Sequence, residues 1–460
     1  MRYLFLLIFP LFFSCNNASV SKVNHSENNI YLNHNDSVSY VGKETCKQCH
    51  FDIYNSYMET GMGKSFAVAT KSKSVLDKNN NPLIYDEVKN LYYQAIWKSD
   101  SLYILEFRLT NKDTTHKLLQ KIDFVIGSGQ HTNSHIFSIN GYLHQAPYTF
   151  YTQEEKGDLP PGYEDGKNSR FSREIGLECM SCHNAYSNHE SESLNKFSSV
   201  PNGIDCERCH GPGEVHVKEK MSGNIIDTSK YIDYTIVNPS KLKKELQFDI
   251  CRRCHLQGTS VLKNKKDWND FIPGTILSET METYLPKYEN DETFIMASHV
   301  DRLQQSECYT IGNITCVSCH NPHKSVTTLA DSYFNNKCMD CHNVCEETTD
   351  NTDCVSCHMP KSSSSDIPHV SITDHKIAVA SKSIEGEEKG AFLGLVCINN
   401  DKPTNLSKAK AYLKHFESFD TNSILLDSAK MFLDKCDKEE SYPFYIQYYY
   451  LQKDYKKLIN

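Results

Sequence analysis

The sequence lacks the features that define several large classes of protein. Basic side chains are not in excess, because 49 Lys and Arg stand against 58 Asp and Glu, a formal net charge of −9, and this argues against a nucleic-acid binder. There is no HExxH or GxxxxGK motif, and the lone Gly127-Ser128-Gly129 predicts a turn rather than a nucleotide site. After the first residues, no apolar run is long enough to span a membrane. With 460 residues, 39% of them apolar, the chain can still bury a sizeable core.

Cysteine is the residue that the sequence has in unusual number, with 19 copies. Fourteen of them form seven Cys-x-x-Cys pairs, and His follows every pair directly. At these frequencies of Cys and His, about 0.03 such pentapeptides are expected by chance, so the seven are not accidental. The pentapeptides carry Cys46/Cys49/His50, Cys179/Cys182/His183, Cys206/Cys209/His210, Cys251/Cys254/His255, Cys316/Cys319/His320, Cys338/Cys341/His342 and Cys354/Cys357/His358.

Each pentapeptide has the residue types that covalent haem attachment needs. Two thiols three residues apart on a helical turn can form thioethers with the two vinyl groups of a haem, and the adjacent imidazole then reaches the iron as proximal ligand. A zinc ribbon needs no His after each pair, and a redox disulfide is usually a single Cys-x-x-Cys. The sequence therefore predicts seven covalently attached haem c groups, bound by the fourteen cysteines and ligated by the seven histidines.

Six of the seven pentapeptides lie between residues 179 and 358, which leaves little chain for other scaffolding. The apolar macrocycles then replace much of a conventional core and must lie close together. Close packing of haems is what electron tunnelling along a chain requires. We therefore expect a mainly α multihaem cytochrome c with little regular structure, a small inserted antiparallel β unit and a C-terminal helical cap.

Each iron needs a sixth ligand or keeps an open position, and thirteen histidines lie outside the pentapeptides. The seven best-placed distal candidates are His131, His189, His216, His299, His323, His369 and His375. Seven candidates for seven irons favour bis-His coordination, although Met62 competes as a ligand of the first haem. His135 and His144 are weaker candidates. We expect the others to be solvated: His25, His34, His116 and His415.

The first residues have the pattern of an export signal. Arg2 precedes an apolar run, Tyr3 to Phe13, that is too short for a membrane span. The run ends at Ser14-Cys15 and resembles a bacterial lipobox, in which Cys15 becomes the lipidated N-terminus; an ordinary secretory peptide is the alternative. Asn16 rather than Asp follows, which by analogy with bacterial sorting favours the outer membrane. We therefore expect a periplasm-facing outer-membrane lipoprotein, with residues 1–15 as signal and 16–39 as a flexible tether.

Between the first and second pentapeptides the pattern changes to short strands. The runs at 91–97 and 102–109 are rich in Tyr, Ile and Phe and are separated by Lys98-Ser99-Asp100-Ser101, which predicts a hairpin. Further strands are expected at 123–126, 135–139 and 148–151. Together they predict a β unit at 83–151, between a first haem segment at 40–82 and a six-haem domain at 152–377.

Beyond residue 377 the chain has no pentapeptide and is helical in pattern. Amphipathic segments at 409–413, 424–433 and 445–455 follow one another at the spacing of helix-turn-helix repeats. We expect 378–460 to form a tetratricopeptide-like helical region, with an unrelated helical cap as the alternative.

Four cysteines besides Cys15 remain unassigned, namely Cys308, Cys345, Cys397 and Cys436. In an oxidising periplasm they can pair, and Cys308 with Cys345 is one such pairing because both lie in the haem-dense segment. The sequence leaves the connectivity open.

Further motifs are spread over residues 40–377, at Thr60–Phe66, Ile126–His131, Pro160–Tyr163, Gly203–Gly213, Ile236–Pro239, Cys357–Lys361 and His369–Ile377. Together with the pentapeptides they resemble a bacterial multihaem cytochrome c family that carries a C-terminal tetratricopeptide region. The haem arrangement is more distantly similar to the tetrahaem electron carrier of the hydroxylamine pathway, and to multihaem nitrite and hydroxylamine enzymes.

The resemblance implies a redox role, with His131, His216, His323, His369 and His375 as distal ligands, whereas His189 matches no position of the family. Pentahaem nitrite reductases usually mark the catalytic haem with Lys in place of the pentapeptide His. All seven pentapeptides here keep His, which argues against that enzyme. The tetratricopeptide region spans about two repeats and should therefore pack on the haem domain.

Three functions remain open from the sequence. The leading one is electron transfer along the haem chain of a lipid-anchored carrier or conduit. The second is reduction of a small nitrogen or sulfur oxyanion at one five-coordinate haem, and the third is a scaffold whose helical tail docks a respiratory partner. Haem carboxylates make the loaded protein more acidic than its sequence, so we expect redox protein partners with basic docking patches. We expect contact with a membrane only through Cys15, and no nucleic acid.

Overall fold

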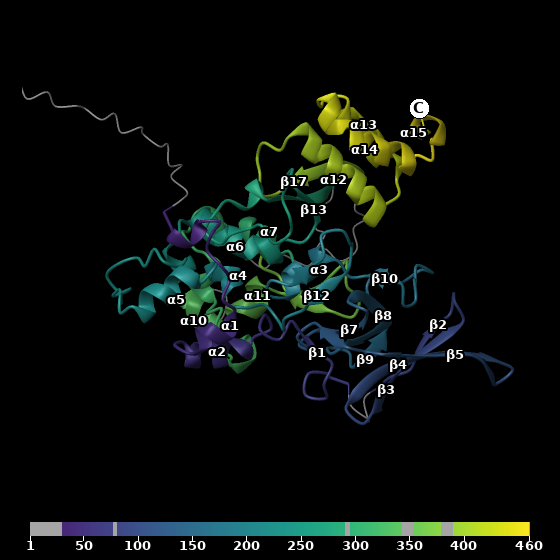
Figure 1. Ribbon diagram of the computed structural model, residues 1–460, viewed down its shortest axis with the longest axis horizontal. Helices are drawn as coiled ribbons and strands as arrows, with labels where there is room; N and C mark the ends of the chain where they lie inside the picture. The colour runs from purple at the N-terminus through teal and green to yellow at the C-terminus, as the bar shows by residue number, and fades with distance from the viewer. Residues whose placement is uncertain (1–29, 77–80, 290–294, 343–352, 379–389, 460) are drawn as a thin grey trace, which may run out of the picture.

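The structure is a computed structural model that describes residues 30–76, 81–289, 295–342, 353–378 and 390–459 (Figure 1). Cys15, the expected signal and most of the tether lie outside these ranges, and so does Cys345. Within them, no helix combines the length and the apolar character that crossing a membrane requires. The lipid anchor and the Cys308–Cys345 pairing therefore stay predictions.

The chain is already packed on the protein at its first described residues. The 3-10 helix η1 (Leu32–His34) begins with a hydrogen bond of 2.8 Å from the Leu32 N–H to the Tyr234 carbonyl. Asn33 and His34 are buried, and their side chains lie 3.0 Å from the carbonyls of His210 and Pro273. The expectation that His34 is solvated in a tether reaching residue 39 is therefore wrong. Both side chains form hydrogen bonds with backbone carbonyls instead of water, in the part of the chain that carries six of the seven pentapeptides (residues 152–377, called the haem-motif region below).

Strands are more numerous than a mainly α chain would have, and the fold is mixed α/β. The first sheet has the antiparallel order β2-β3-β4-β5. Its strands are β2 (Ile84–Asp86), β3 (Leu91–Lys98), β4 (Ser101–Thr110) and β5 (Asp113–Lys121). β3 and β4 pair up to Lys98 and Ser101, which confirms the predicted hairpin. Leu91, Tyr93 and Ala95 alternate with more exposed residues, so one face of β3 lies on the core.

A second, six-stranded sheet has the order β1-β6-β7-β8-β10, with β9 beside β8. Its strands are β1 (Phe66–Val68), β6 (Phe124–Ile126), β7 (Thr132–Ile139), β8 (Tyr142–Tyr151), β9 (Lys156–Asp158) and β10 (Arg173–Glu174). Because β1, β9 and β10 come from outside 83–151, the predicted β unit is too narrow. Strands of two or three residues are too short to show a periodic pattern.

The two sheets share one hydrophobic core. Tyr93 and Ile104 of the first sheet pack in the same cluster as Val125, Tyr148 and Phe150 of the second, and all five are buried. The two sheets lie together at the lower right of Figure 1, below the C-terminal helices.

Short helices lie at and around the pentapeptides. They are α1 (Lys43–Lys47), α2 (Phe51–Met58), α3 (Leu177–His183), α4 (Glu207–His210), α5 (Glu214–Met221), α6 (Lys244–His255), α7 (His299–Gln304), α8 (Glu307–Thr310), α9 (Cys316–Cys319), α10 (Tyr333–Met339) and α11 (Cys354–His358). The predicted helical turn is present: the N–H of His210 donates to the Cys206 carbonyl at 3.0 Å, and that of His320 to the Cys316 carbonyl at 2.9 Å.

The remaining elements of the haem-motif region are short. They are β11 (Asn188–His189), β12 (Phe197–Ser199), β13 (Thr259–Leu262), β14 (Met281–Tyr288), β15 (Lys361–Ser363), β16 (Ser371–Thr373), and the 3-10 helices η2 (Pro239–Lys241), η3 (Leu277–Glu279) and η4 (Val326–Thr328).

In residues 390–459, the described part of the C-terminal region, the structure has four helices and one strand. The helices are α12 (Asn405–Ser418), α13 (Ser423–Leu433), α14 (Lys438–Leu451) and α15 (Tyr455–Ile459), and β17 (Phe392–Cys397) pairs with β14. The predicted helices are present, but β17 adds a strand where only helix was expected. The ring of His415, expected to be solvated, is buried with its Nδ1 2.7 Å from the Thr259 hydroxyl. This contact ties α12 to β13.

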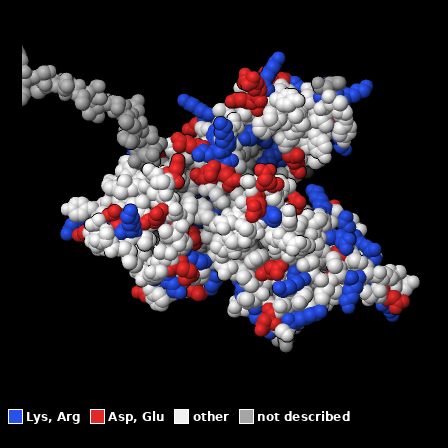
Figure 2. Space-filling model, in the orientation of Figure 1, with Lys and Arg blue, Asp and Glu red and all other residues white. Residues whose placement is uncertain are grey.

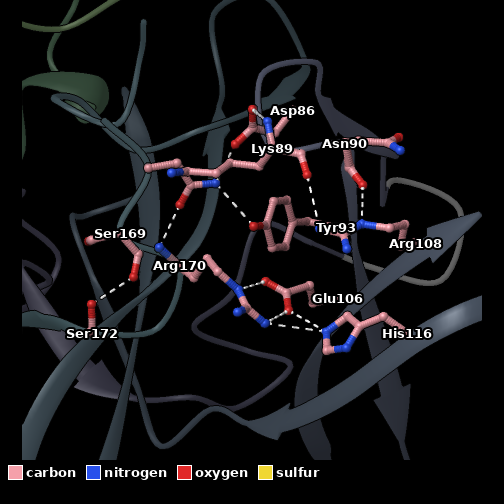
Figure 3. Close-up of polar contacts among 11 residues, drawn as sticks. Asp86, Lys89, Asn90, Tyr93, Glu106, Arg108, His116, Ser169, Arg170 and Ser172 are labelled. Atoms are coloured by element: carbon pink, nitrogen blue, oxygen red, sulfur yellow. Dashed lines mark hydrogen bonds and ion pairs between the residues drawn. The ribbon is translucent and has the colours of Figure 1, made fainter. Parts of the chain in front are cut away.

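A polar network fastens the loop before β10 to the first sheet (Figure 3). Glu106 of β4 is fully buried and accepts hydrogen bonds from Arg170 and from His116, whose Nε2 lies at 2.7 Å. The Asn168 amide donates to Tyr93 at 3.0 Å. Burial raises the pKa of Glu106, but the hydrogen bonds from Arg170 and His116 outweigh it and hold that pKa below its ordinary value. His116 is therefore a partner of a buried carboxylate, while its side chain remains 36% exposed, in agreement with the expected solvation.

We expect Glu106→Gln to lower the free energy of unfolding by about 2 kcal/mol at pH 7. This is less than the ~3–5 kcal/mol for breaking a fully buried pair, because the Arg170 side chain is 44% exposed. Since the folded pKa lies below the ordinary 4.5, the wild-type advantage is complete above that pH and shrinks as the pH falls through the folded pKa. Urea unfolding followed by far-ultraviolet circular dichroism at pH 7 and pH 3 measures both effects.

Asp100→Asn is the matched control. It removes a 3.1 Å pair with Lys71 at the same sheet, but Asp100 is 93% exposed, so the change should stay below about 1 kcal/mol. Equal losses from Glu106→Gln and Asp100→Asn would contradict the role given to the buried network.

Candidate functional site

Cysteines of different pentapeptides lie against one another at four places. The four pairs of thiols in which one cysteine shifts the pKa of the other are Cys46 with Cys206, Cys182 with Cys254, Cys251 with Cys316, and Cys338 with Cys354. In the first of these pairs, the interaction between the thiols raises the pKa of Cys46 and lowers that of Cys206. All seventeen cysteines in the described ranges are free thiols, Cys308, Cys397 and Cys436 included, so none of these contacts is a disulfide. Pentapeptides that are far apart in the sequence thus meet through their sulfur atoms.

The two cysteines of the first pentapeptide differ in their surroundings, although the sequence motif treats them alike. Cys46 contacts Cys206, whereas Cys49 lies in the turn between α1 and α2 and has an exposed thiol. The N–H of Cys49 still donates to the Cys46 carbonyl at 3.2 Å, so the turn itself is formed. Cys49 is thus more exposed than expected for a cysteine in a closely packed group of haem sites. Its thioether bond stays a prediction. Three other pentapeptide cysteines are also exposed residues, namely Cys179, Cys341 and Cys357, although burial raises the pKa of the Cys179 thiol to about 11.

Three of the pentapeptide histidines face a second imidazole. The ring centres of His50 and His216 are 6.3 Å apart with an angle of 20° between the planes. His210 and His323 are separated by 6.0 Å at 8°, and His320 and His375 by 6.1 Å at 22°. In each of these near-parallel pairs, one ring comes from a pentapeptide and the other from a predicted distal ligand.

Several of these rings are held by a hydrogen bond at Nδ1. The Nδ1 of His210 lies 2.7 Å from the Val237 carbonyl, that of His375 lies 3.0 Å from the Thr373 carbonyl, and that of His216 lies 3.0 Å from the Thr235 hydroxyl. An acceptor at Nδ1 fixes the tautomer and leaves Nε2 free to bind a metal. Burial lowers the pKa of His210 to about 4, which keeps its imidazole neutral as a metal ligand must be.

The three near-parallel pairs fit axial coordination of an iron, in which both rings contain the line from nitrogen to metal. A metal–nitrogen distance of about 2 Å, with about 1.1 Å more to each ring centre, separates the centres of two axial imidazoles by about 6 Å. The observed 6.0 to 6.3 Å agree with this distance. The residues present therefore fit haem iron between His50 and His216, between His210 and His323, and between His320 and His375.

The histidine of the fourth pentapeptide lies in a cluster rather than in one stacked pair. The ring of His299 is 5.2 Å from that of His255 at 90°, and 4.8 Å from that of His375 at 73°. Burial, and then the neighbouring His255 and His375, lower the pKa of His299. The Nδ1 atoms of His299 and His131 are buried without a hydrogen-bond partner among the described atoms. Both are neutral imidazoles with a nitrogen still available to a metal.

The histidine of the second pentapeptide has different surroundings. Within the described residues, no imidazole stacks on His183, whose carbonyl accepts a 2.6 Å hydrogen bond from the Ser65 hydroxyl. Burial lowers the pKa of His183, and the charge of Lys73 also lowers it. The Lys73 ammonium donates at 2.7 Å to the Gly127 carbonyl. The motifs at 60–66 and 126–131 therefore meet beside the second pentapeptide.

A polar cavity of about 570 Å³ opens at this meeting point. No residue of a pentapeptide lines it; its polar lining includes Lys64, Lys73, Ser128, Gln130 and Asn202. Burial lowers the pKa of Lys73 to about 8, and the neighbouring Lys64 adds to this. Lys73 is still mostly cationic at pH 7, whereas Lys64 is paired at 2.5 Å with Glu59, which also lines the cavity. The positive charge of the cavity therefore comes from Lys73.

Two predicted distal ligands make no ring contact with a pentapeptide histidine among the described residues. His369 is held between carboxylates, with Nδ1 2.7 Å from Glu154 and Nε2 3.0 Å from Asp158. His189 of β11 lies in a smaller cavity of about 320 Å³ that Asp267 and Asn269 also line. Within the described ranges, no imidazole stacks on His342 or His358, the histidines of the sixth and seventh pentapeptides. The structure thus places three of the seven candidates in stacked pairs and leaves His131, His189, His299 and His369 outside them.

His135, expected to be a weak candidate, has the environment of a ligand. It is fully buried in β7, its Nδ1 lies 2.8 Å from the Tyr148 carbonyl, and its Nε2 has no partner among the described atoms. Burial lowers its pKa to about 4. A single histidine in a strand gives no sequence signal of this burial.

Comparison with known proteins identifies part of the chain. Residues 146–211 match the family described as cytochrome c554 and c-prime, and this segment contains the second and third pentapeptides. The chain is accordingly a multihaem c-type cytochrome with covalently bound haem c. No curated protein matches it. A solved structure, the outer cell wall cytochrome OcwA, aligns with a TM-score of 0.45 and 15% identity, over 74% of this chain and 79% of that chain.

Proposed function

We propose that this multihaem c-type cytochrome carries electrons along seven haems, one at each pentapeptide. The observation that supports the proposal is the sulfur contact between pentapeptides. Because the thioether bonds attach the macrocycles at these sulfur atoms, contacting cysteines bring the edges of neighbouring haems together. A bound haem iron supplies reversible one-electron chemistry, and the chain supplies the spacing.

The contacts between cysteines define one route through the protein. Direct contacts join the first pentapeptide to the third, the fourth to both the second and the fifth, and the sixth to the seventh. The Cys251 thiol also interacts electrostatically with Cys209, which supports a position of the third haem near the fourth. Cys319 interacts electrostatically with Cys341, which supports a position of the sixth haem near the fifth. We therefore propose the order one, three, four, five, six, seven, with the second haem branching from the fourth.

For the first haem, the stacking of His50 on His216 supports His216 rather than Met62 as the distal ligand. The Met62 carbonyl accepts hydrogen bonds from the N–H groups of Ser65 and Ile204, which holds its loop on the side of the second and third pentapeptides. By the same argument His323 serves the third haem and His375 the fifth. Two imidazoles favour low-spin iron, which changes its coordination little on reduction.

The haem count is tested by the intact mass of the mature protein. We expect seven haem increments on the processed chain, together with the mass of acyl groups on Cys15 because we propose an outer-membrane lipoprotein. Cys15→Ala should remove the acyl mass and release the protein in soluble form while all seven haems remain. Fewer haems in a fully matured sample would contradict the count, and an equally membrane-bound Cys15→Ala variant would contradict the anchor.

We propose that the redox partners present basic patches. The chain has a net charge of −9, and the carboxylates of each haem add to it. On the face drawn in Figure 2, acidic side chains gather between the haem-motif helices and the C-terminal helices, whereas basic ones lie mainly over β2–β5. Electron exchange with the native partner should therefore slow as ionic strength rises. A stopped-flow rate that does not change with salt would contradict an electrostatic docking.

A second candidate function is reduction of a small nitrogen or sulfur oxyanion at the second haem. The specific observation in its favour is the cationic cavity beside His183, a histidine that has no stacked imidazole among the described residues. Lys73 would attract an anion to this place, because Lys64 is already paired with Glu59. The sulfur contacts support the electron-transfer function more directly, because they involve eight of the fourteen pentapeptide cysteines.

Carbon monoxide distinguishes the two functions. If the protein only transfers electrons, the reduced wild type binds no carbon monoxide, and the oxidised protein shows only low-spin signals in electron paramagnetic resonance. His323→Ala should open one iron and create one carbon monoxide site per molecule, since His323 faces His210 in a stacked pair. A wild-type site that binds carbon monoxide and also turns over nitrite or tetrathionate would instead support the reductase.

A further inference from the structure

Arg253 is a buried cation between the two cysteines of the fourth pentapeptide. Its side chain leaves α6 and reaches the second pentapeptide on α3, where Nη1 lies 3.4 Å from the Cys182 sulfur and Nη2 lies 2.6 Å from the Ser181 hydroxyl. Nη2 also donates at 2.6 Å to the Trp268 carbonyl. Because only 7% of its surface is exposed, water stabilises the charge of Arg253 only weakly.

The described surroundings of Arg253 hold no carboxylate in contact with it. Its hydrogen-bond partners are a hydroxyl, a carbonyl and a sulfur, and the Trp268 ring lies 6.0 Å from the guanidinium carbon. The adjacent Arg252 is equally buried, but it pairs with Asp249 at 2.9 Å and with Glu245 at 3.6 Å. Arg252 is therefore neutralised by carboxylates, whereas Arg253 has no anionic contact once haem attachment turns the Cys182 thiol into a thioether. A buried charge without a counterion is costly to the fold, which calls for a function.

The charge of Arg253 lies where two pentapeptides meet. The thiols of Cys182 and Cys254 interact with each other, and Arg253 contacts the first of them. Both sulfur atoms are attachment points of macrocycles in the proposed function. The edges of the second and fourth haems thus come together beside this guanidinium.

We propose that Arg253 raises the midpoint potentials of the haems at the second and fourth pentapeptides. The inference rests on the proposed function, because it requires haem at both sites. When a one-electron donor reduces a ferric iron, the site gains one negative charge and no bond is made or broken. A fixed positive charge in a poorly solvated site stabilises the reduced state. The haems at this junction are therefore the ones that electrons entering the row of haems reduce preferentially.

Redox titration of the holoprotein, followed at the visible α band, tests the proposal. In Arg253→Gln, the part of the absorbance change that belongs to these two haems, about two-sevenths of the total, should occur at lower potential than in the wild type. In Arg253→Lys that part should stay near the wild-type potential, because the charge is retained. Arg252→Gln combined with Asp249→Asn is the matched control. It also removes a buried arginine of this pentapeptide, but together with its paired carboxylate, so it should leave these two potentials nearly unchanged.

A second pair of variants keeps Arg253 in place, in case Arg253→Gln does not fold. Ser181 is 1% exposed and already bonded to Nη2, so Ser181→Asp sets a carboxylate against the guanidinium and should lower the same two potentials. Ser181→Asn, of similar shape and without charge, should not. Unmoved potentials in both Arg253→Gln and Ser181→Asp, or equal shifts in Arg253→Gln and Arg253→Lys, would overturn the proposal.

The proposed function can fail separately from this inference. A mass with fewer than seven haems, or a wild type that exchanges no electrons, would count against the proposed function before any variant is compared. If the protein binds seven haems and transfers electrons, but its potentials do not change on substitution at residues 253 and 181, only the role of Arg253 is overturned.

Discussion

One helical turn, closed by a hydrogen bond from the pentapeptide His N–H to the carbonyl of the first Cys, is the constraint on which the rest of the structure depends. This bond measures 2.9 Å from His50 to Cys46 and 3.0 Å from His342 to Cys338. The turn brings both sulfur atoms and the imidazole to positions that one macrocycle can reach. Because neighbouring pentapeptides touch through these sulfurs, the placement of each turn also sets the spacing of the proposed haems.

Features that depend on local sequence were predictable, and pairings between distant segments were not. The hairpin of β3 and β4 follows from alternation and a polar turn, and the start of α12 follows from a Thr404 cap that accepts from the Ser407 N–H. The stacking of His50 on His216 joins segments from opposite sides of both sheets in the sequence. No periodicity encodes such a pairing, so the sequence could offer seven distal candidates without assigning any to an iron.

The conventional cores lie outside the region that carries most of the pentapeptides. The largest apolar clusters fill the space between the two sheets and the inside of the C-terminal helices. The clusters around α6, α7 and β16 are small, with Phe248, Val300 and Leu303 as the buried members of one of them. Fewer buried apolar side chains leave less hydrophobic stabilisation from the chain itself. Bound macrocycles, which are large and apolar, are the natural source of the missing burial.

The C-terminal helices belong to the same structural unit as the redox sites. Glu282 of β14 is fully buried and bonded to Lys263 and to Ser407 of α12, while the Tyr284 hydroxyl lies 2.9 Å from Ser407. Removing either side of this contact would leave buried polar groups unsatisfied, so β14 and α12 have to remain together.

The same helix also reaches the second pentapeptide. The Lys414 ammonium of α12 lies 2.7 Å from Glu178 on α3 and 4.9 Å from the centre of the Trp268 ring. The carbonyl of Trp268 in turn accepts from Arg253. A partner that docks on the C-terminal helices would therefore be linked, through α12 and Trp268, to the junction of the second and fourth pentapeptides.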